Sequence, residues 1–411
     1  MIDTSTQIGR GVYSIYQRYD QLRFTGYIQP QWQWASDKGV KSYSGGDFGP
    51  YSNDRFMLRR GRLRVDYIIR KDGIHPVTQF VLQVDATERG VVARDIWGRY
   101  FENRLGLFSF TAGLFARPFG YEVNLSSSDR EAPERGRASQ ILMRNERDLG
   151  FMVSLDPRGK LLHSLRWLKL DVGVFNGQGL ISPGEYDSYK DIIARLYVRP
   201  VSALPNGWRL SGGVSVLEGA IFNPAAALYK VDGTGDNARI RADSFASPKA
   251  RRSYIGADVQ LKIPNGGGRN SEFRAEYLQG TQTGTIAGSE TPGTLPTGTA
   301  ASTPFLVERP FNAAYFSFLQ NIFSSRHQLG LKYDWYDANT RVQGQQLIAS
   351  KGFNSADVRF DTFGGGYIFY ITPQLKATFW YEHVLNEKTL LPGFTEDVSD
   401  DVFTSRLQFR F

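Results

Sequence analysis

The feature that most restricts the fold is a two-residue alternation of apolar and polar side chains. In the stretch LRFTGYIQPQWQW, every second residue from Leu22 to Trp34 is apolar or glycine, and the residues between are Arg, Thr, Tyr and Gln. A β-strand points successive side chains to opposite faces, so this stretch predicts a strand with one apolar and one polar face. Such a strand fits a soluble sandwich with an apolar core or a membrane barrel with an apolar outer face.

The same alternation recurs in about sixteen segments, each near the ~10 residues that a tilted membrane strand needs. Clear examples are residues 60–67, 79–86, 168–174, 254–263 and 328–335. No run approaches the roughly 20 apolar residues of a membrane-spanning helix. An even number of strands also returns both termini of the chain to the same side of the membrane.

The connections between these segments alternate in length. Short links rich in turn residues lie at 70–76, 264–270, 324–326 and 372–374. Long polar stretches lie between them, at 35–54, 119–146, 217–252, 280–308, 336–357 and 386–400. This sorting predicts an all-β transmembrane antiparallel barrel over residues 22–411, with short periplasmic turns and long extracellular loops. We expect residues 1–21 to form an N-terminal periplasmic lead-in.

Composition argues against an enzyme. The 411-residue chain has no cysteine and four scattered histidines, which leaves little for a triad or a metal. We therefore expect no catalytic residue, no metal, no cofactor and no nucleic-acid partner. The opening stretch MIDTSTQIGRGVYS has no apolar core of a signal peptide, so we expect an exported protein to be represented here in its mature form.

The last strand indicates the cellular location. In FTSRLQFRF one face carries Phe403, Leu407, Phe409 and Phe411, and the sequence ends on an aromatic residue. A terminal strand of this form is the kind that the outer-membrane assembly machinery reads. We therefore predict a protein of the bacterial outer membrane, in contact with the lipid bilayer and with lipopolysaccharide. The formal net charge of +8 is compatible with basic loops that face lipopolysaccharide or with an anion-attracting lumen.

Four stretches resemble the porin O and P family, the phosphate-selective porins, particularly members from Bacteroidota. They are FMLRRGRLRVDY, TAGLFARPFGYE, VGVFNGQG and ARLYVRP, and ARPFGYE at residues 116–122 is the most specific of them. The resemblance implies a sixteen-stranded trimer whose third long loop, here 119–146, folds inward while basic side chains funnel anions. This loop carries arginines and acids but no lysine, so a lysine-ringed phosphate site is not implied.

The candidate pore residues follow from strand parity. Arg60, Arg62 and Arg64 share one face, and facing lipid would cost each about 2–4 kcal/mol at the bilayer centre. They should face the lumen, either as an anion-attracting wall or paired to acids such as Asp85, Glu131 or Glu134. The predicted pore-lining basic residues are Arg60, Arg62, Arg64, Arg99, Arg117, Lys169, Lys262 and Lys332. The predicted constriction-loop residues are Arg130, Glu131, Glu134, Arg135 and Arg137.

Together these features predict a water-filled, anion-favouring diffusion channel for small solutes such as phosphate. The alternative is a structural or docking barrel whose long loops bind a partner.

Two local sequence patterns predict further structural details. SDRE at residues 128–131 has the form of a helix-capping box and predicts a short helix there. The glycines at 364–366 lie inside a strand and indicate a bend or close packing.

Overall fold

The computed structural model describes residues 21–144, 146–201, 207–225, 227–244, 248–294 and 306–411. The predicted lead-in at 1–21 lies, apart from Gln21, outside the described residues. The strands are β1 (Leu22–Ala35), β2 (Asp54–Lys71), β3 (His75–Thr87), β4 (Gly90–Phe101), β5 (Phe108–Ala116), β6 (Arg147–Leu155), β7 (Leu168–Phe175), β8 (Asp191–Val201), β9 (Arg209–Phe222), β10 (Leu228–Asp232), β11 (Arg239–Asp243), β12 (Lys249–Pro264), β13 (Asn270–Thr285), β14 (Leu306–Ile322), β15 (His327–Asp337), β16 (Phe360–Thr372), β17 (Leu375–Asn386) and β18 (Val402–Arg410). The helical elements are α2 (Arg137–Leu142) and the 3-10 turns η1 (His163–Leu165), η2 (Gly179–Ile181), η4 (Gly235–Asn237), η5 (Gly344–Gln346), η6 (Ala349–Lys351) and η7 (Ser355–Asp357).

Within the described residues, sixteen strands close into one antiparallel barrel. Each strand from β1 to β8 pairs with the next one, β9 pairs with β12, and consecutive pairing continues from β12 to β18. The last strand returns to the first, with Trp32 opposite Ser405 and Tyr27 opposite Arg410. The predicted all-β transmembrane barrel of about sixteen strands is therefore confirmed.

The remaining two strands form a hairpin outside the barrel wall. β10 pairs with β11, and β10 also runs parallel to the start of β14, with Tyr229 opposite Val307. The long polar connection predicted over 217–252 is shorter than expected, because β9 continues to Phe222, β12 begins at Lys249, and the hairpin lies between them. β9 and β12 stay hydrogen-bonded to each other along the whole length of β9, so both are longer than the ~10 residues that a membrane strand needs.

The strand faces differ as the alternation predicts. On β3 the outward side chains of Phe80 and Leu82 are 52% and 48% exposed, whereas the inward Gln83 and Asp85 are buried. Outward apolar side chains are typical of a lipid-facing surface, and inward polar side chains of a lumen. Among the described residues, no helix combines the length and apolar character needed to cross a bilayer.

The glycine cluster in β16 gives room to a tryptophan of the neighbouring strand. A Cβ atom on Gly364 would lie 2.9 Å from Nε1 of Trp380, and a Cβ atom on Gly330 would lie 2.9 Å from its ring. Trp380 is 2% exposed, so its ring is buried over these positions. Glycine is therefore needed at these positions because the tryptophan ring packs directly against the backbone.

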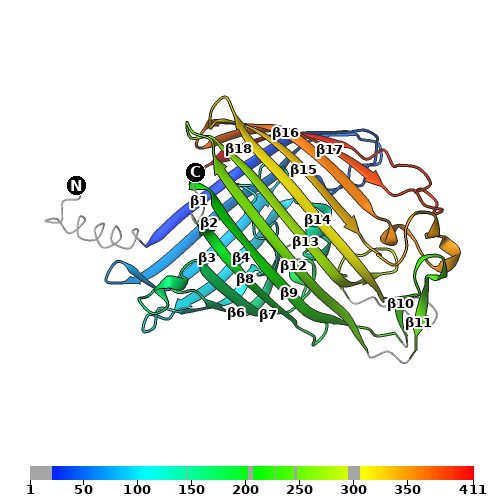
Figure 1. Cartoon of the computed structure of the whole chain (residues 1–411), viewed down its shortest axis with the longest axis horizontal. Helices are drawn as coiled ribbons and strands as arrows, with labels where there is room; N and C mark the ends of the chain where they lie inside the picture. Colours follow the sequence, from blue (N-terminus) through cyan, green and yellow to red (C-terminus); the bar gives the residue numbers. More distant parts are fainter. Residues whose placement is uncertain (1–20, 145, 202–206, 226, 245–247, 295–305) are drawn as a thin grey trace.

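The long connections gather at one end of the barrel and the short turns at the other (Figure 1). The loop that follows β1 and the loops that follow β15 and β17 lie at the same end as the β10–β11 hairpin. The β14–β15 and β16–β17 turns lie at the opposite end, together with the C-terminus. In an outer-membrane barrel the end with the long loops faces outward from the cell.

Candidate pore constriction

The connection between β5 and β6, residues 117–146, is the third loop, and contacts with the barrel wall hold its beginning inside the lumen. Glu276 on β13 accepts hydrogen bonds from the backbone N–H groups of Tyr121 and Glu122. Gly120 has a φ of +66°, and a Cβ atom there would collide with the Glu276 carboxylate. Only glycine meets both requirements without strain. The ARPFGYE stretch therefore ends where the loop attaches to the wall.

The third loop also buries an apolar cluster against one side of the barrel. Phe119, Ile141 and Leu142 are each at most 3% exposed and pack with inward residues of β5 to β15. Phe119 meets Tyr254 edge-on, with 6.0 Å between ring centroids. Burial on this scale contributes about 1.5–3 kcal/mol for each large side chain. The loop thus fills part of the lumen beside these strands.

A second attachment is a buried charge cluster around Glu134. Its carboxylate lies 2.9 Å from Arg59 Nε, 2.7 Å from Arg60 Nη2 and 2.7 Å from Arg406 Nη2. Burial by itself would raise the pKa of Glu134, but the three guanidinium groups outweigh it and hold that pKa well below its usual range. One carboxylate therefore ties the loop to β2 and β18 at once.

Further ion pairs fix the rest of the loop. Glu122 binds Lys332 on β15 at 2.5 Å, and Glu131 binds Arg274 on β13 at 2.7 Å. Arg135 pairs with Glu146 at 2.8 Å within the loop itself. Ion pairs therefore connect the loop to β13 and β15 as well as to β2 and β18.

A β-bulge allows Arg59 and Arg60 to reach the same carboxylate. Gln29 of β1 lies opposite Arg60, but the next residue, Pro30, lies opposite Leu58, so Arg59 has no partner in the register. Consecutive strand residues normally face opposite sides, and a bulge removes this restriction locally. Sequence parity missed Arg59; the available signal was Pro30, because proline within a sheet is confined to edges, strand starts and bulges.

The helix of the third loop is not at the predicted place. α2 begins at Arg137, whereas SDRE at 128–131 belongs to a turn in which Arg130 N–H donates to the Ser126 carbonyl at 3.1 Å. A capping box needs the Glu131 carboxylate to return to the backbone, and Arg274 binds it instead. Glu131 is likewise not the partner of the arginine wall that the sequence suggested.

Three cavities that share lining residues lie around the third loop. The outer cavity measures about 1350 Å³, a middle passage about 300 Å³ and the inner cavity about 890 Å³. Arg62 and Arg135 line both the outer cavity and the passage. Arg64 and Arg147 line both the passage and the inner cavity. The passage therefore lies between the outer and the inner cavity and is the smallest of the three.

The passage is strongly basic. Of the ionisable Asp, Glu, Lys and Arg side chains that line it, five are cationic and Asp129 alone is anionic. The cations are Arg62, Arg64, Arg135, Arg147 and Arg410. Each of the five is ion-paired: Arg62 with Asp85 at 2.9 Å, Arg64 with Asp66 at 2.7 Å, Arg135 with Glu146 at 2.8 Å, Arg147 with Asp95 at 3.2 Å and Arg410 with Asp129 at 3.0 Å. Of these acids only Asp129 lines the passage, so the side chains that face it are mainly guanidinium groups.

The other predicted basic residues are distributed between the path and the framework. Arg99, Lys169 and Lys262 line the inner cavity. Lys332 is buried behind the loop, in its pair with Glu122. Arg117 lies outside the lining of the three cavities formed by the described residues; its Nη2 donates to the Arg144 carbonyl at 3.2 Å. β5 ends one residue earlier, so strand parity no longer applies at Arg117.

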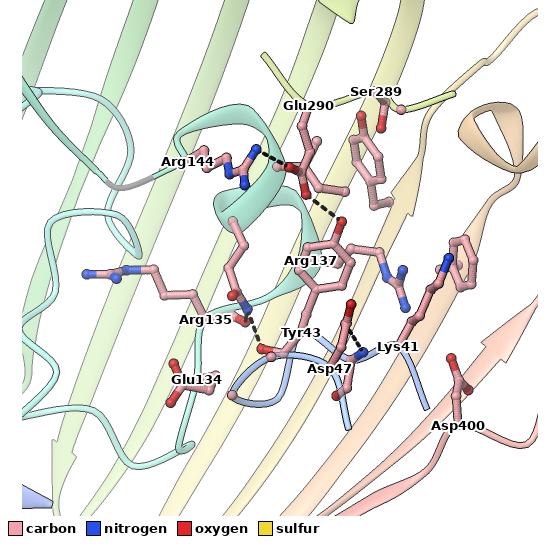
Figure 2. A pocket seen from close by; sticks show the side chains of 18 of the residues that line it. Lys41, Tyr43, Asp47, Glu134, Arg135, Arg137, Arg144, Ser289, Glu290 and Asp400 are labelled. Atoms are coloured by element: carbon pink, nitrogen blue, oxygen red, sulfur yellow. Dashed lines mark hydrogen bonds and ion pairs between the residues drawn. The ribbon is translucent and has the colours of Figure 1, made fainter. Parts of the chain in front are cut away.

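The outer cavity is framed by several loops (Figure 2). Glu290 accepts a hydrogen bond from the Tyr43 hydroxyl at 3.0 Å and pairs with Arg144 at 2.9 Å, which joins three loops. The guanidinium carbon of Arg137 lies 3.7 Å from the centroid of the Phe360 ring. Such stacking leaves a cation fixed in place while its edge remains free to bind anions.

A closed barrel whose lumen is narrowed by an inward loop is the architecture of an outer-membrane channel. No protein-family model and no curated protein matches the sequence. Solved structures with a similar fold include OprB of Pseudomonas putida, with a TM-score of 0.64 and 12% identity over 98% of this chain and 97% of that one. The outer membrane channel DcaP of Acinetobacter baumannii has a TM-score of 0.56 and 14% identity over 95% and 97% of the two chains.

A third similar structure is the anion-selective porin from Comamonas acidovorans. Its TM-score is 0.51 at 10% identity, over 95% of this chain and 99% of that chain. At such identities the likeness concerns the fold. The outer-membrane barrel fold is common to all three, and the predicted bacterial outer-membrane location agrees with it.

Proposed function

We propose that the protein is an outer-membrane porin, a water-filled diffusion channel that favours small anions. The observation that carries the proposal is the charge of the passage, where five cations and one acid line about 300 Å³. A narrow lumen lined with charge of one sign raises the local concentration of the opposite ion. In the proposed channel solutes cross this point, so the passage would set the selectivity of the whole channel.

The arginines suit oxyanions such as phosphate. A guanidinium group binds phosphate or carboxylate in a bidentate fashion, and Arg62 and Arg64 repeat along β2 at about 7 Å. The resemblance to phosphate-selective porins supports phosphate as a solute and a homotrimer as the assembly. Lipid and lipopolysaccharide would surround the outward apolar band and the basic loops.

Conductance in a planar bilayer tests the proposal directly. Purified full-length protein should insert with stable, ohmic steps, in groups of three if the trimer is correct. The reversal potential should be measured across a potassium chloride gradient at about 0.1 M, where the Debye length is about 10 Å. Its sign should show that chloride is more permeant than potassium. A cation-selective reversal potential would refute the anion preference. Protein that inserts without conducting would favour the docking barrel.

Selectivity should depend on pH through Asp400, in the loop that follows β17. Burial raises its pKa to about 7, with Asp397 and Asp401 adding to the shift and Arg137 opposing it. Below that pKa the outer cavity loses one negative charge. One charge at about 10 Å in water is worth about 0.4 kcal/mol, which screening at about 0.1 M salt reduces to about 0.15 kcal/mol. The charge acts with opposite sign on anions and cations, so the anion-to-cation permeability ratio should rise about 1.5-fold from pH 8 to pH 6.

The variant Asp400→Asn should hold the ratio near its low-pH value at both pH values, as measured by reversal potentials. An unchanged pH response in this variant would assign the titration to another group.

A further inference from the structure

A small cavity of about 30 Å³ lies behind the third loop, apart from the solute passage. Arg130 and neighbouring loop residues form one side of it. Tyr315 on β14, Lys332 on β15 and Trp380 on β17 form part of the other. A cavity of this size has room for about two waters or one small ion.

Three residues that line this cavity carry buried hydrogen-bond donors with no acceptor among the described residues. They are Nε, Nη1 and Nη2 of Arg130, the hydroxyl of Tyr315 and Nε1 of Trp380. The three residues are 5%, 6% and 2% exposed. Buried polar groups nearly always have hydrogen-bond partners, so this many unpaired groups lining one cavity indicate a ligand that accepts hydrogen bonds.

Charge points to the same kind of ligand. The carboxylates that line the cavity are already paired: Glu122 with Lys332, Glu131 with Arg274 and Glu134 with Arg60. Arg130 therefore has no ion-pair partner among the described residues. Burial, together with the nearby Arg135 and Arg60, lowers the pKa of Arg130 well below its usual value. An arginine stays charged in proteins, so this site favours an anion as its counter-charge.

We propose that the cavity binds one monoatomic anion, chloride under cellular conditions, between Arg130 and the wall residues Tyr315 and Trp380. The guanidinium supplies the charge, and the phenol and indole supply further donors. Arg130 also lines the outer cavity, which gives the ion a route of entry. The bound anion holds the third loop to β14 and β17 and does not lie on the solute path. The inference does not depend on the proposed channel activity.

Bromide can report this site in crystals of the full-length protein. In crystals grown in sodium bromide, anomalous diffraction at the bromine edge should give a peak within hydrogen-bonding distance of the Arg130 guanidinium. Density in the cavity without an anomalous signal would identify water and overturn the proposal. Bromide peaks confined to the protein surface would also overturn it.

A measurement in solution tests whether the anion also binds outside the crystal, at lower halide concentration. With sodium chloride replacing sodium gluconate at constant ionic strength, the midpoint of thermal unfolding in detergent should rise for the parent, because an ion that binds only the folded state stabilises it. Arg130→Met should lose this rise. Arg144→Met, in the same loop but paired with Glu290 at the outer cavity, should keep it. An equal rise in Arg130→Met, or none in the parent, would refute the site.

Discussion

Replacing Arg62 and Arg64 together by glutamine should lower the anion-to-cation permeability ratio about tenfold. The double variant removes two of the five cations that line the passage. At about 6 Å in water each charge is worth about 0.7 kcal/mol, which screening at about 0.1 M salt reduces to about 0.4 kcal/mol. Each charge acts with opposite sign on anions and cations, so two charges shift the ratio by about 1.5 kcal/mol, a factor of about ten. The measurement is the reversal potential near about 0.1 M salt, since screening over about 3 Å at 1 M would hide the effect.

The barrel should remain folded in this variant, because the acids that pair with these arginines keep other partners. Asp85 retains Arg94 at 3.5 Å, and Asp66 retains a hydrogen bond from Gln79 at 2.9 Å.

The control Arg241→Gln with Arg251→Gln removes the same charge from exposed pairs away from the passage. It should leave the reversal potential unchanged. If the passage variant conducts with the parent's reversal potential, the arginine wall is structural only.

The variant Glu134→Gln should loosen the third loop and destabilise the protein. It leaves Arg59, Arg60 and Arg406 without their shared carboxylate in a buried site. Removing one partner of a buried ion pair costs about 3–5 kcal/mol. The heat-induced loss of the compact form on gels should shift to lower temperature. Single-channel currents should become larger or noisier, because the loop that narrows the lumen is released from β2 and β18.

Glu290→Gln is the matched control for this change. It also removes a carboxylate that binds an arginine of the third loop, but the Arg144 and Glu290 side chains are 47% and 31% exposed. Exposed ion pairs contribute about 0–1 kcal/mol, so the gel transition should hardly move. Equal behaviour of Glu134→Gln and the parent in both measurements would show that the other attachments of the loop hold it without this carboxylate.

The barrel could be predicted from the sequence because its signal is local. Each strand carries its own alternation, and placing Arg60 or Asp85 on the inner face needs only the parity of a few neighbours. The strand count follows in the same way. Ends of strands were less predictable, since β9 and β12 continue beyond the bilayer and lose the apolar face that marks a lipid contact.

The constriction could be predicted only in part, because its contacts join distant segments. Glu134 and Arg406 are separated by 272 positions, and no local pattern relates them. Parity also places Tyr254 on the polar face, yet it packs against Phe119 of the loop. An inward side chain meets either water or the loop, and the sequence of one strand does not distinguish the two.

The bulge at Arg59 bears on how densely charge can be placed on a barrel wall. Regular strands present one inward side chain about every 7 Å, which limits the number of groups that can reach one point. The inserted residue halves that spacing locally, while the pairs on either side, Gln29 with Arg60 and Pro30 with Leu58, stay in register. A single-residue insertion thus adds a cation to the lumen without turning any neighbour towards lipid. Selectivity in such a wall can change by insertion as well as by substitution.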